Sequence, residues 1–296
     1  MENQIVISII LIILGLMSGS FVGATVWRLR ARQLRLDAKA GEKVSATSKK
    51  QVAKLQHAPL HKDRSVCLHC GHTLAWYDLV PLVSWLSLGG KCRYCHRPIG
   101  WLEPVLELTL AIFFVCSYLL WPATITPGVE LFRFVVWLVA GVGLAMLFVY
   151  DMKWYLLPNV VTFPLIGLGL LYAIVIVVVG KFAPSVIISV LLGCLILSGL
   201  YYVIYVLSKQ QWIGFGDVKL GLALALLLAD WQLAVLALFL ANLIGTVLFL
   251  PALLMGKVKR QAHIPFGPLL ITGWAIAGLF GSAILQWYLS LALGLR

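Results

Sequence analysis

The chain has 296 residues, of which 61% are hydrophobic and only 11% are charged, and its net charge is +12. A soluble domain has about 45 to 50% apolar and about 25% charged residues, so this composition excludes an ordinary soluble enzyme and is typical of a polytopic membrane protein. The positive charge does not indicate nucleic-acid binding, because the Lys and Arg residues gather where membrane topology explains them.

Windows of about 20 apolar residues predict eight membrane spans, of which the sixth is short. The first has a longer apolar run than a secretory signal and no preceding positive residue, so we expect a retained helix. The expected fold is therefore all-α, with about eight transmembrane helices. The spans lie near residues 4–26, 104–121, 131–150, 160–180, 185–207, 218–230, 231–254 and 268–292.

The distribution of Lys and Arg predicts how these helices are oriented. Of the 23 basic residues, 14 lie between Arg28 and Leu102, and six more fall on the same predicted face. Short basic loops stay in the cytoplasm. We therefore expect the long segment inside and both termini outside, with some basic residues binding anionic lipids.

The cytoplasmic insert between the first two spans changes character along its length. Residues 28–64 are rich in Arg, Lys, Ala, Gln and Ser, which predicts a flexible or partly helical solvated linker. Residues 65–100 contain two Cys-x-x-Cys pairs, separated by 21 residues. Such pairs are typical of a tetrahedral Zn(II) site, although this separation slightly exceeds the usual range. The predicted ligands are Cys67, Cys70, Cys92 and Cys95.

We expect this metal to be structural, because four thiolates leave no open coordination position for a substrate. A segment this small also needs a bound metal to stay folded. Disulfides or a redox couple are the alternative, disfavoured in a reducing cytosol. The nearby histidines are expected to be surface residues, and the two remaining cysteines small core residues. These are His69, His72 and His96, and Cys116 and Cys194.

Acidic residues are scarce in the second half of the chain. From Leu131 onward the only carboxylates are Asp151, Asp217 and Asp230. Placing an ionised carboxylate at the centre of a membrane helix costs about 2.5 to 3.5 kcal/mol of insertion free energy. Carboxylates that are nevertheless present are therefore expected to have a function. The predicted topology places Asp151 and Asp217 together at the cytoplasmic boundary. Two adjacent carboxyls share one proton, as in the aspartic proteases.

The surrounding residues suit that chemistry. Gly214 and Gly216 are expected to reach positive φ values and to let a substrate strand approach, and Leu157-Pro158-Asn159 breaks the chain after Asp151. The alternative is that each aspartate caps a helix or pairs with a nearby lysine. Lys219 is two residues from Asp217, which are not on one helix face, so snorkelling to head groups is expected of it. Asp230 is interpreted as an outer-interface residue.

Taken in order, these features resemble the bacterial type IV prepilin peptidase family. The resemblance runs nearly end to end. Its motifs are Gly19-Ser20-Phe21, Arg28-Leu29, Ser65-Val66-Cys67, Asp78, Pro81, Ser84, Trp85, the second cysteine pair, Ile99, Pro104, Glu107, Asp151, Leu157-Pro158-Asn159, Gly214-Phe215-Gly216-Asp217-Val218-Lys219-Leu220 and Ile264-Pro265-Phe266-Gly267-Pro268.

The resemblance implies an intramembrane aspartic endopeptidase in the bacterial inner membrane. It would cut the leader of prepilins or pseudopilins after a glycine, and methylate the new amino terminus with S-adenosylmethionine as donor. Residues 1–27 would form the first helix, 28–102 the methyltransferase region and 103–296 the peptidase. Asp151 and Asp217 would be catalytic. We expect the unwound stretches around Gly214, Gly216 and Lys219, and around Phe266, Gly267 and Pro268, to position the substrate by strand addition.

The chain departs from the family pattern at three positions in its amino-terminal third. Gly23 stands where Asn is usual, Arg30 where Pro is common and Glu103 where Tyr is usual. The resemblance assigns methyl transfer to this third. The sequence has no glycine-rich dinucleotide motif, so S-adenosylmethionine rests on the resemblance alone, and the residues that hold it are not identified.

Two other classes of function are compatible with the composition. A proton-coupled transporter would have carboxylates near mid-membrane and an internal repeat, which the sequence does not show. A zinc-bearing scaffold would recruit partners through the insert and would tolerate loss of Asp151 or Asp217. Among the proteases, an archaeal-type preflagellin peptidase is disfavoured because that group generally lacks the cysteine insert.

Overall fold

The computed structural model describes residues 2–41, 45, 52, 54–55, 64–256 and 265–292. Within these residues the regular elements are helices, together with two isolated β-bridges. The chain divides into two compact units, Met1–Tyr118 and Leu119–Arg296. Seven helical segments of the described chain are long and apolar enough to cross a membrane, and the predicted sixth span is not among them.

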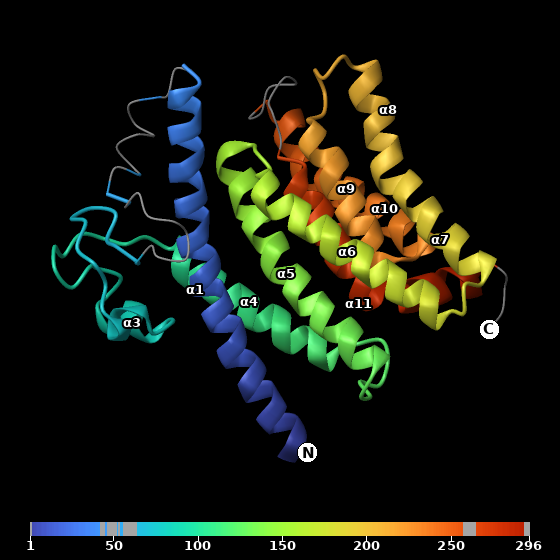
Figure 1. Cartoon of the computed structure of the whole chain (residues 1–296), viewed down its shortest axis with the longest axis horizontal. Coiled ribbons are helices and arrows are strands. Elements are labelled where there is room, and N and C mark those ends of the chain that lie inside the picture. Colours follow the sequence, from blue (N-terminus) through green and yellow to red (C-terminus); the bar gives the residue numbers. More distant parts are fainter. Residues whose placement is uncertain are drawn as a thin grey trace. The chain divides into compact units, whose positions relative to one another are not determined.

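The first unit contains two apolar helices and the insert that joins them (Figure 1). Helix α1 spans Glu2–Lys39 and α4 spans Leu102–Leu119, while the insert contains η1, Trp76–Leu79, and α3, Val83–Ser87. At 1.5 Å per residue, the 38 residues of α1 extend about 57 Å. This exceeds the about 30 Å hydrocarbon core of a bilayer. The helix therefore continues through the first part of the predicted linker.

Helices α1 and α4 pack backbone against backbone at two glycines. A Cβ on Gly15 would lie 2.5 Å from the Cα of Ala111, and one on Gly19 would lie 2.3 Å from the Cα of Glu107. Small residues four positions apart allow membrane helices to approach this closely. The contact places the buried Glu107 directly against α1.

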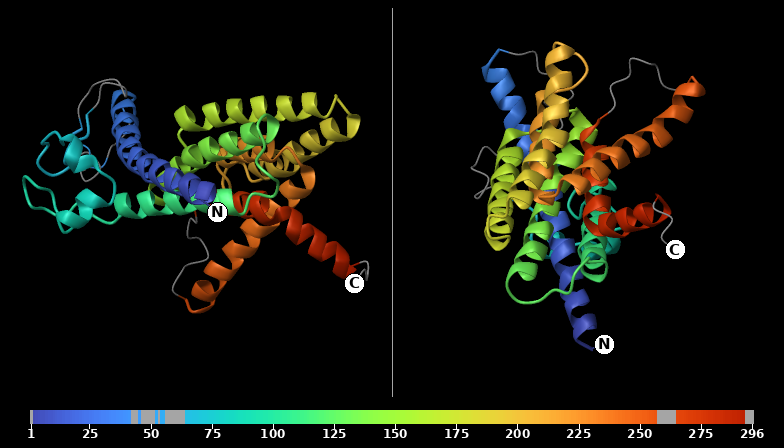
Figure 2. Two further views of the ribbon diagram at one scale, coloured as in Figure 1. Left: turned by 90° about the horizontal axis from the view of Figure 1, so that it is seen from below. Right: turned by 90° about the vertical axis from the view of Figure 1, so that its right-hand side faces the viewer.

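The second unit contains helices α5 to α11 (Figure 1). A π-helical turn, η2, joins α7 to α8, so that these three elements form one span. Helices α10 and α11 pack together and then diverge toward their carboxyl-terminal ends (Figure 2). The bounds are α5 Val129–Trp154, α6 Asn159–Val179, α7 Pro184–Cys194, η2 Leu195–Gly199, α8 Leu200–Leu207, α9 Phe215–Leu228, α10 Trp231–Leu254 and α11 Gly267–Ala292.

The short helix α9 lies at the centre of the second unit. It contacts α6, α7, η2, α8, α10 and α11, and nearly all of its side chains from Val218 onward are buried. Its 14 residues extend only about 21 Å, less than the about 30 Å hydrocarbon core of a bilayer. Because protein rather than lipid surrounds α9, its length need not match the membrane. This segment is the predicted sixth span.

Candidate functional site

Asp151 lies one turn before the end of α5 and is only 6% exposed. Helix α5 ends at Trp154. The next residue, Tyr155, reverses the chain with a left-handed backbone, and α6 begins at Asn159. The predicted chain break after Asp151 is therefore present. Oδ2 of Asp151 accepts a hydrogen bond of 3.1 Å from the backbone N–H of Gly267, which belongs to a different helix.

Gly267 is the first residue of α11, where backbone N–H groups lack partners within the helix. The carboxylate of Asp151 therefore caps α11 from another part of the chain. A Cβ at position 267 would lie 2.8 Å from Oδ2 of Asp151, so the contact requires glycine. Pro268 suits the first turn because it has no N–H to satisfy, and Ile264 of the same motif lies outside the described residues.

Asp217 lies in the first turn of α9, which packs against both α6 and α11. Its carboxyl accepts a backbone hydrogen bond from Gly214, and it is close enough to Asp151 for the two carboxyls to interact electrostatically. The structure thus brings the two predicted aspartates together within one unit. Asp217 lies at the amino-terminal end of α9, and the carboxylate of Asp151 meets the amino-terminal end of α11; the dipoles of both helix ends favour negative charge.

The predicted reason for the glycines before Asp217 is wrong. Gly214 has φ −77° and ψ 149° and is the N-cap of α9, while Gly216 already belongs to the helix. Neither residue has a positive φ, and only Gly214 is extended. Gly216 instead provides space, because a Cβ there would lie 3.2 Å from the side chain of Leu157. The residue is small so that α9 can pack against the break after α5.

Lys219 occupies a defined position between two helices. Its Nζ donates a hydrogen bond to Oδ1 of Asn159, the first residue of α6. The same atom lies 5.5 Å from the ring centroids of both Phe163 and Phe215. The lysine thus links α9 to α6 within the protein, and its predicted contact with substrate stays a prediction.

Tyr201 of α8 is a site residue that the sequence analysis missed. Its ring lies 5.4 Å from that of Phe266, and Tyr205, one turn later, lies 5.4 Å from Phe215. This face of α8 therefore packs against the starts of both α9 and α11. Tyr201 is 4% exposed, and its hydroxyl has no hydrogen-bond partner in the described part of the chain. It lies within electrostatic range of Asp217.

The π-helical turn η2 fixes the position of α8. A Cβ on Gly221 of α9 would lie 2.2 Å from the carbonyl oxygen of Leu197, so the two backbones touch. The hydroxyl of Ser198 donates a 3.0 Å hydrogen bond to the carbonyl of Val218. Such π-helical turns are frequent at functional sites. No sequence signal indicated Tyr201, which follows this turn, because an aromatic residue in an apolar run is usually part of a core.

In the first unit, the four predicted ligand cysteines converge. Their sulfur atoms lie within 4.8 Å of one another, and the sulfurs of Cys67 and Cys95 are 3.8 Å apart. Tetrahedral Zn–S bonds of about 2.3 Å place sulfurs about 3.8 Å apart, so the arrangement fits a metal ion. All six cysteines are free thiols, which does not support the disulfide alternative. Burial raises the pKa of Cys67 to about 12, so a metal must displace its proton.

The two cysteine pairs adopt the same turn. In each, the N–H of the first cysteine donates to the carbonyl five residues later, at 2.9 Å. The carbonyls of Cys67 and Cys92 accept from the N–H groups of Gly71 and His96, respectively. These last two residues have φ values of 78° and 54°, the left-handed conformation that such a turn needs. Two matching turns thus present four sulfurs to one point.

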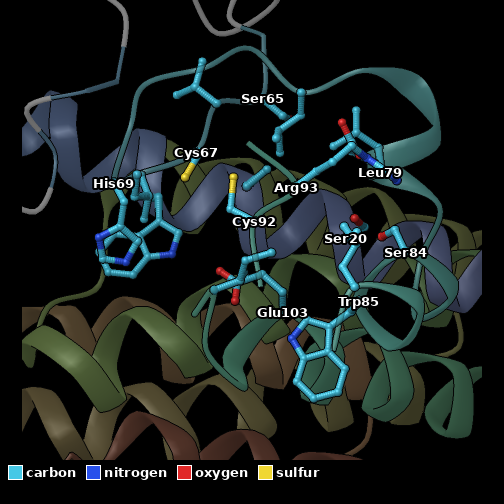
Figure 3. Close-up of a pocket in the computed structure, with 18 of the residues that line it drawn as sticks. Ser20, Ser65, Cys67, His69, Leu79, Ser84, Trp85, Cys92, Arg93 and Glu103 are labelled. Atoms are coloured by element: carbon cyan, nitrogen blue, oxygen red, sulfur yellow. The ribbon is translucent and has the colours of Figure 1, made fainter. Parts of the chain in front are cut away.

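A cavity of about 210 Å³ adjoins the cysteine cluster inside the first unit (Figure 3). Side chains from α1, the insert and α4 line it, including Cys67, Cys92 and Glu103. Trp85 is fixed at its wall by a 3.0 Å hydrogen bond from Nε1 to the carbonyl of Gly100. No sequence motif predicted this cavity, because its lining residues are spread from α1 to α4.

The other residues considered from the sequence have simpler surroundings. Asp230 is the N-cap of α10 and accepts a 3.0 Å hydrogen bond from the N–H of Leu233, and its predicted place at the outer interface stays a prediction. The three predicted surface histidines are exposed. Cys116 and Cys194 are half-buried within their helices rather than fully in a core.

Comparison with known proteins gives consistent matches over most of the chain. Residues 13–121 match the Bacterial Peptidase A24 N-terminal domain, and residues 138–250 match the Type IV leader peptidase family. Among curated relatives, the prepilin leader peptidase/N-methyltransferase of Aeromonas hydrophila is 35% identical over 77% of this chain and 75% of its own length. That of Pseudomonas aeruginosa is 32% identical over 95% and 93%. No solved structure matches.

Proposed function

The chain belongs to the type IV leader peptidase family, and from that membership we propose that Asp151 and Asp217 cut the leader of type IV prepilins or pseudopilins. It is a multi-pass membrane peptidase with N-methyltransferase activity. The family match gives no support to the transporter or scaffold alternatives. The residues that carry each activity are the part that we propose.

The observation that carries the proposal is the meeting of Asp151, Asp217 and Gly267 at the ends of three helices. An ionised carboxylate accepts a backbone N–H more strongly than a neutral carboxylic acid does, so we assign Asp151 as the ionised carboxylate that takes a proton from water. Asp217 then donates a proton to the carbonyl oxygen of the scissile bond. Attack by water gives a tetrahedral intermediate, and the dyad returns the proton to the leaving amine.

The scissile segment must be extended, because a helical carbonyl is hydrogen-bonded and shielded. Gly214 is extended, and Pro265 and Phe266 are not helical, so both stretches offer backbone groups for strand addition. The hydroxyl of Tyr201 lies nearby without a partner among the described residues. We assign it as a donor to the substrate carbonyl, where negative charge develops in the transition state.

We also propose how the protein is oriented in the membrane and which metal its four clustered cysteines bind. The basic residues support a cytoplasmic insert, both termini outside and an inner-membrane location. The ends of α5, α9 and α11 that carry Asp151, Asp217 and Gly267 would then lie at the cytoplasmic boundary. Zn(II) bound by Cys67, Cys70, Cys92 and Cys95 would stabilise the insert, since the sulfur spacing fits that ion. S-adenosylmethionine would supply the methyl group, as the names of the relatives suggest.

The test is cleavage of a purified prepilin, followed by mass spectrometry. Wild-type protein should release the leader, whereas Asp151→Asn and Asp217→Asn should each reduce cleavage by several orders of magnitude while the protein remains folded. Asp230→Asn is the matched control, because this aspartate caps α10 away from the dyad. Full cleavage by both Asp151→Asn and Asp217→Asn would end the dyad proposal.

A further inference from the structure

The cavity in the first unit contains unpaired charges of both signs. Among the described residues, three arginines and three carboxylates line it, and of these only Arg93 and Asp78 form an ion pair with each other, at 2.7 Å. Within the described residues, Arg28 and Glu103 have no ion-pair partner. Opposite charges that line one cavity without meeting each other are complementary to a ligand that carries both signs.

The negative part of this lining is built on one face of α4. Glu103 and Glu107 are four residues apart, which places them one turn apart on the same side of the helix, and both line the cavity. Glu107 is 6% exposed. It accepts a 2.8 Å hydrogen bond from the N–H of Leu82 and another from Ser20. The two carboxylates are close enough to interact electrostatically.

Two neighbouring carboxylates repel each other, and a buried charge without an opposite partner is costly. Leu82 and Ser20 supply neutral donors to Glu107, so they hold the carboxylate in place without cancelling its charge. A cationic ligand group at Glu103 and Glu107 would remove the repulsion. Glu103 points into the cavity (Figure 3), where such a group has access.

The wall beside these carboxylates is aromatic. Trp85 is fixed by its bond to Gly100 and packs against Gly90, where a Cβ would lie 2.9 Å from the indole. A rigid indole face attracts cations and stacks against planar bases. Arg28 lies on the same lining, with its guanidinium 3.4 Å from the hydroxyl of Ser65, and is suited to a carboxylate.

We propose that this cavity binds S-adenosylmethionine, with the sulfonium group held by Glu103 and Glu107. The proposal rests on the methyl-transfer part of the proposed function and gives it a site. S-adenosylmethionine carries a sulfonium, an α-carboxylate and a purine, which correspond to the glutamates, Arg28 and Trp85. In the transfer, the amine lone pair forms the N–CH3 bond and the S–CH3 electron pair stays on sulfur. The excess proton on nitrogen leaves to solvent.

The test is titration calorimetry of the full-length protein with S-adenosylmethionine and with its product S-adenosylhomocysteine. The sulfur of this product is a neutral thioether instead of a positively charged sulfonium. Glu103→Gln should weaken binding of S-adenosylmethionine by about tenfold or more and leave S-adenosylhomocysteine nearly unchanged. Glu107→Gln should have the same effect on the two affinities. The metal content of this variant reports whether the insert remains folded. Glu130→Gln, the same change in the second unit beside Arg133, should alter neither affinity.

The possible outcomes separate the proposals. Equal losses for both ligands, or no loss for either, would overturn the sulfonium assignment. Unchanged donor affinity with a raised KM for a precut pilin would show that the glutamates hold the substrate ammonium instead. If wild-type protein binds neither ligand, the methyl-transfer part of the proposed function fails, whereas leader cleavage by Asp151 and Asp217 is unaffected by that result.

Discussion

The backbone N–H of Gly267 donates a hydrogen bond to Oδ2 of Asp151 across 116 residues of sequence. The bond makes one aspartate the cap of the helix that starts beside it. Because the aspartate is held by a helix end rather than by a flexible side chain, its position depends on how α5 and α11 pack. The Phe-Gly-Pro motif and the aspartate motif are therefore parts of a single site.

We expect Gly267→Ala to slow leader cleavage while sparing the fold. The added methyl group would lie 2.8 Å from Oδ2 of Asp151 and would displace the carboxylate. A misplacement of about 1 Å can cost about 100-fold in rate. Helical Gly167, where an added Cβ meets nothing within 4 Å, provides the control, and Gly167→Ala should cleave normally. Wild-type kcat in Gly267→Ala would show that this contact does not position the dyad.

Tyr201→Phe should affect stability and activity in opposite directions. Its hydroxyl is buried without a partner among the described residues, so removing it should leave the thermal midpoint unchanged or raise it. If that hydroxyl binds the substrate carbonyl, kcat should fall by about 100- to 1,000-fold, with little change in KM. The neighbouring Tyr202 is exposed, and Tyr202→Phe is the matched control. An unchanged kcat would limit Tyr201 to packing.

Removing one cysteine ligand should release the metal and unfold the insert. Apparent binding free energies of structural zinc are about 10 to 16 kcal/mol in small domains, more than an insert of this size can replace. Cys92→Ala should therefore contain no zinc by elemental analysis and should expose reactive thiols. Cys194→Ala, in α7 of the second unit, should retain one metal ion per chain. Metal-free wild-type protein with four reactive thiols would contradict the zinc assignment.

The sequence predicted those features that depend on local pattern. Apolar windows located the helices, and Cys-x-x-Cys spacing located the sulfur cluster, because each signal is contained in a few neighbouring residues. The sixth span shows the limit of this approach. Its apolar run is genuine, but helix α9 is surrounded by protein, and hydropathy cannot distinguish burial in protein from burial in lipid.

The sequence could not predict contacts that depend on packing between distant segments. Nothing near Asp151 indicates that Gly267 binds it, and nothing near Tyr201 indicates that a π-helical turn directs it toward Asp217. The predicted role of the two glycines before Asp217 was wrong for the same reason, because it considered only their local backbone. Gly216 makes room for Leu157, a residue from another segment, and neither glycine adopts a positive φ.

Proteolysis and methylation should be separable, because the residues assigned to them lie in different units of the chain. Asp217→Asn should give neither product from an intact prepilin, since no free amine is released. Given a precut, unmethylated pilin and S-adenosylmethionine, the same variant should methylate the pilin at nearly the wild-type rate.

Conversely, Cys92→Ala should lose more methylation than cleavage, because the cavity adjoins the cysteine cluster. Mass spectrometry of the pilin amino terminus measures both products in one sample. If folded Asp217→Asn leaves the precut pilin unmethylated, the two activities share a site.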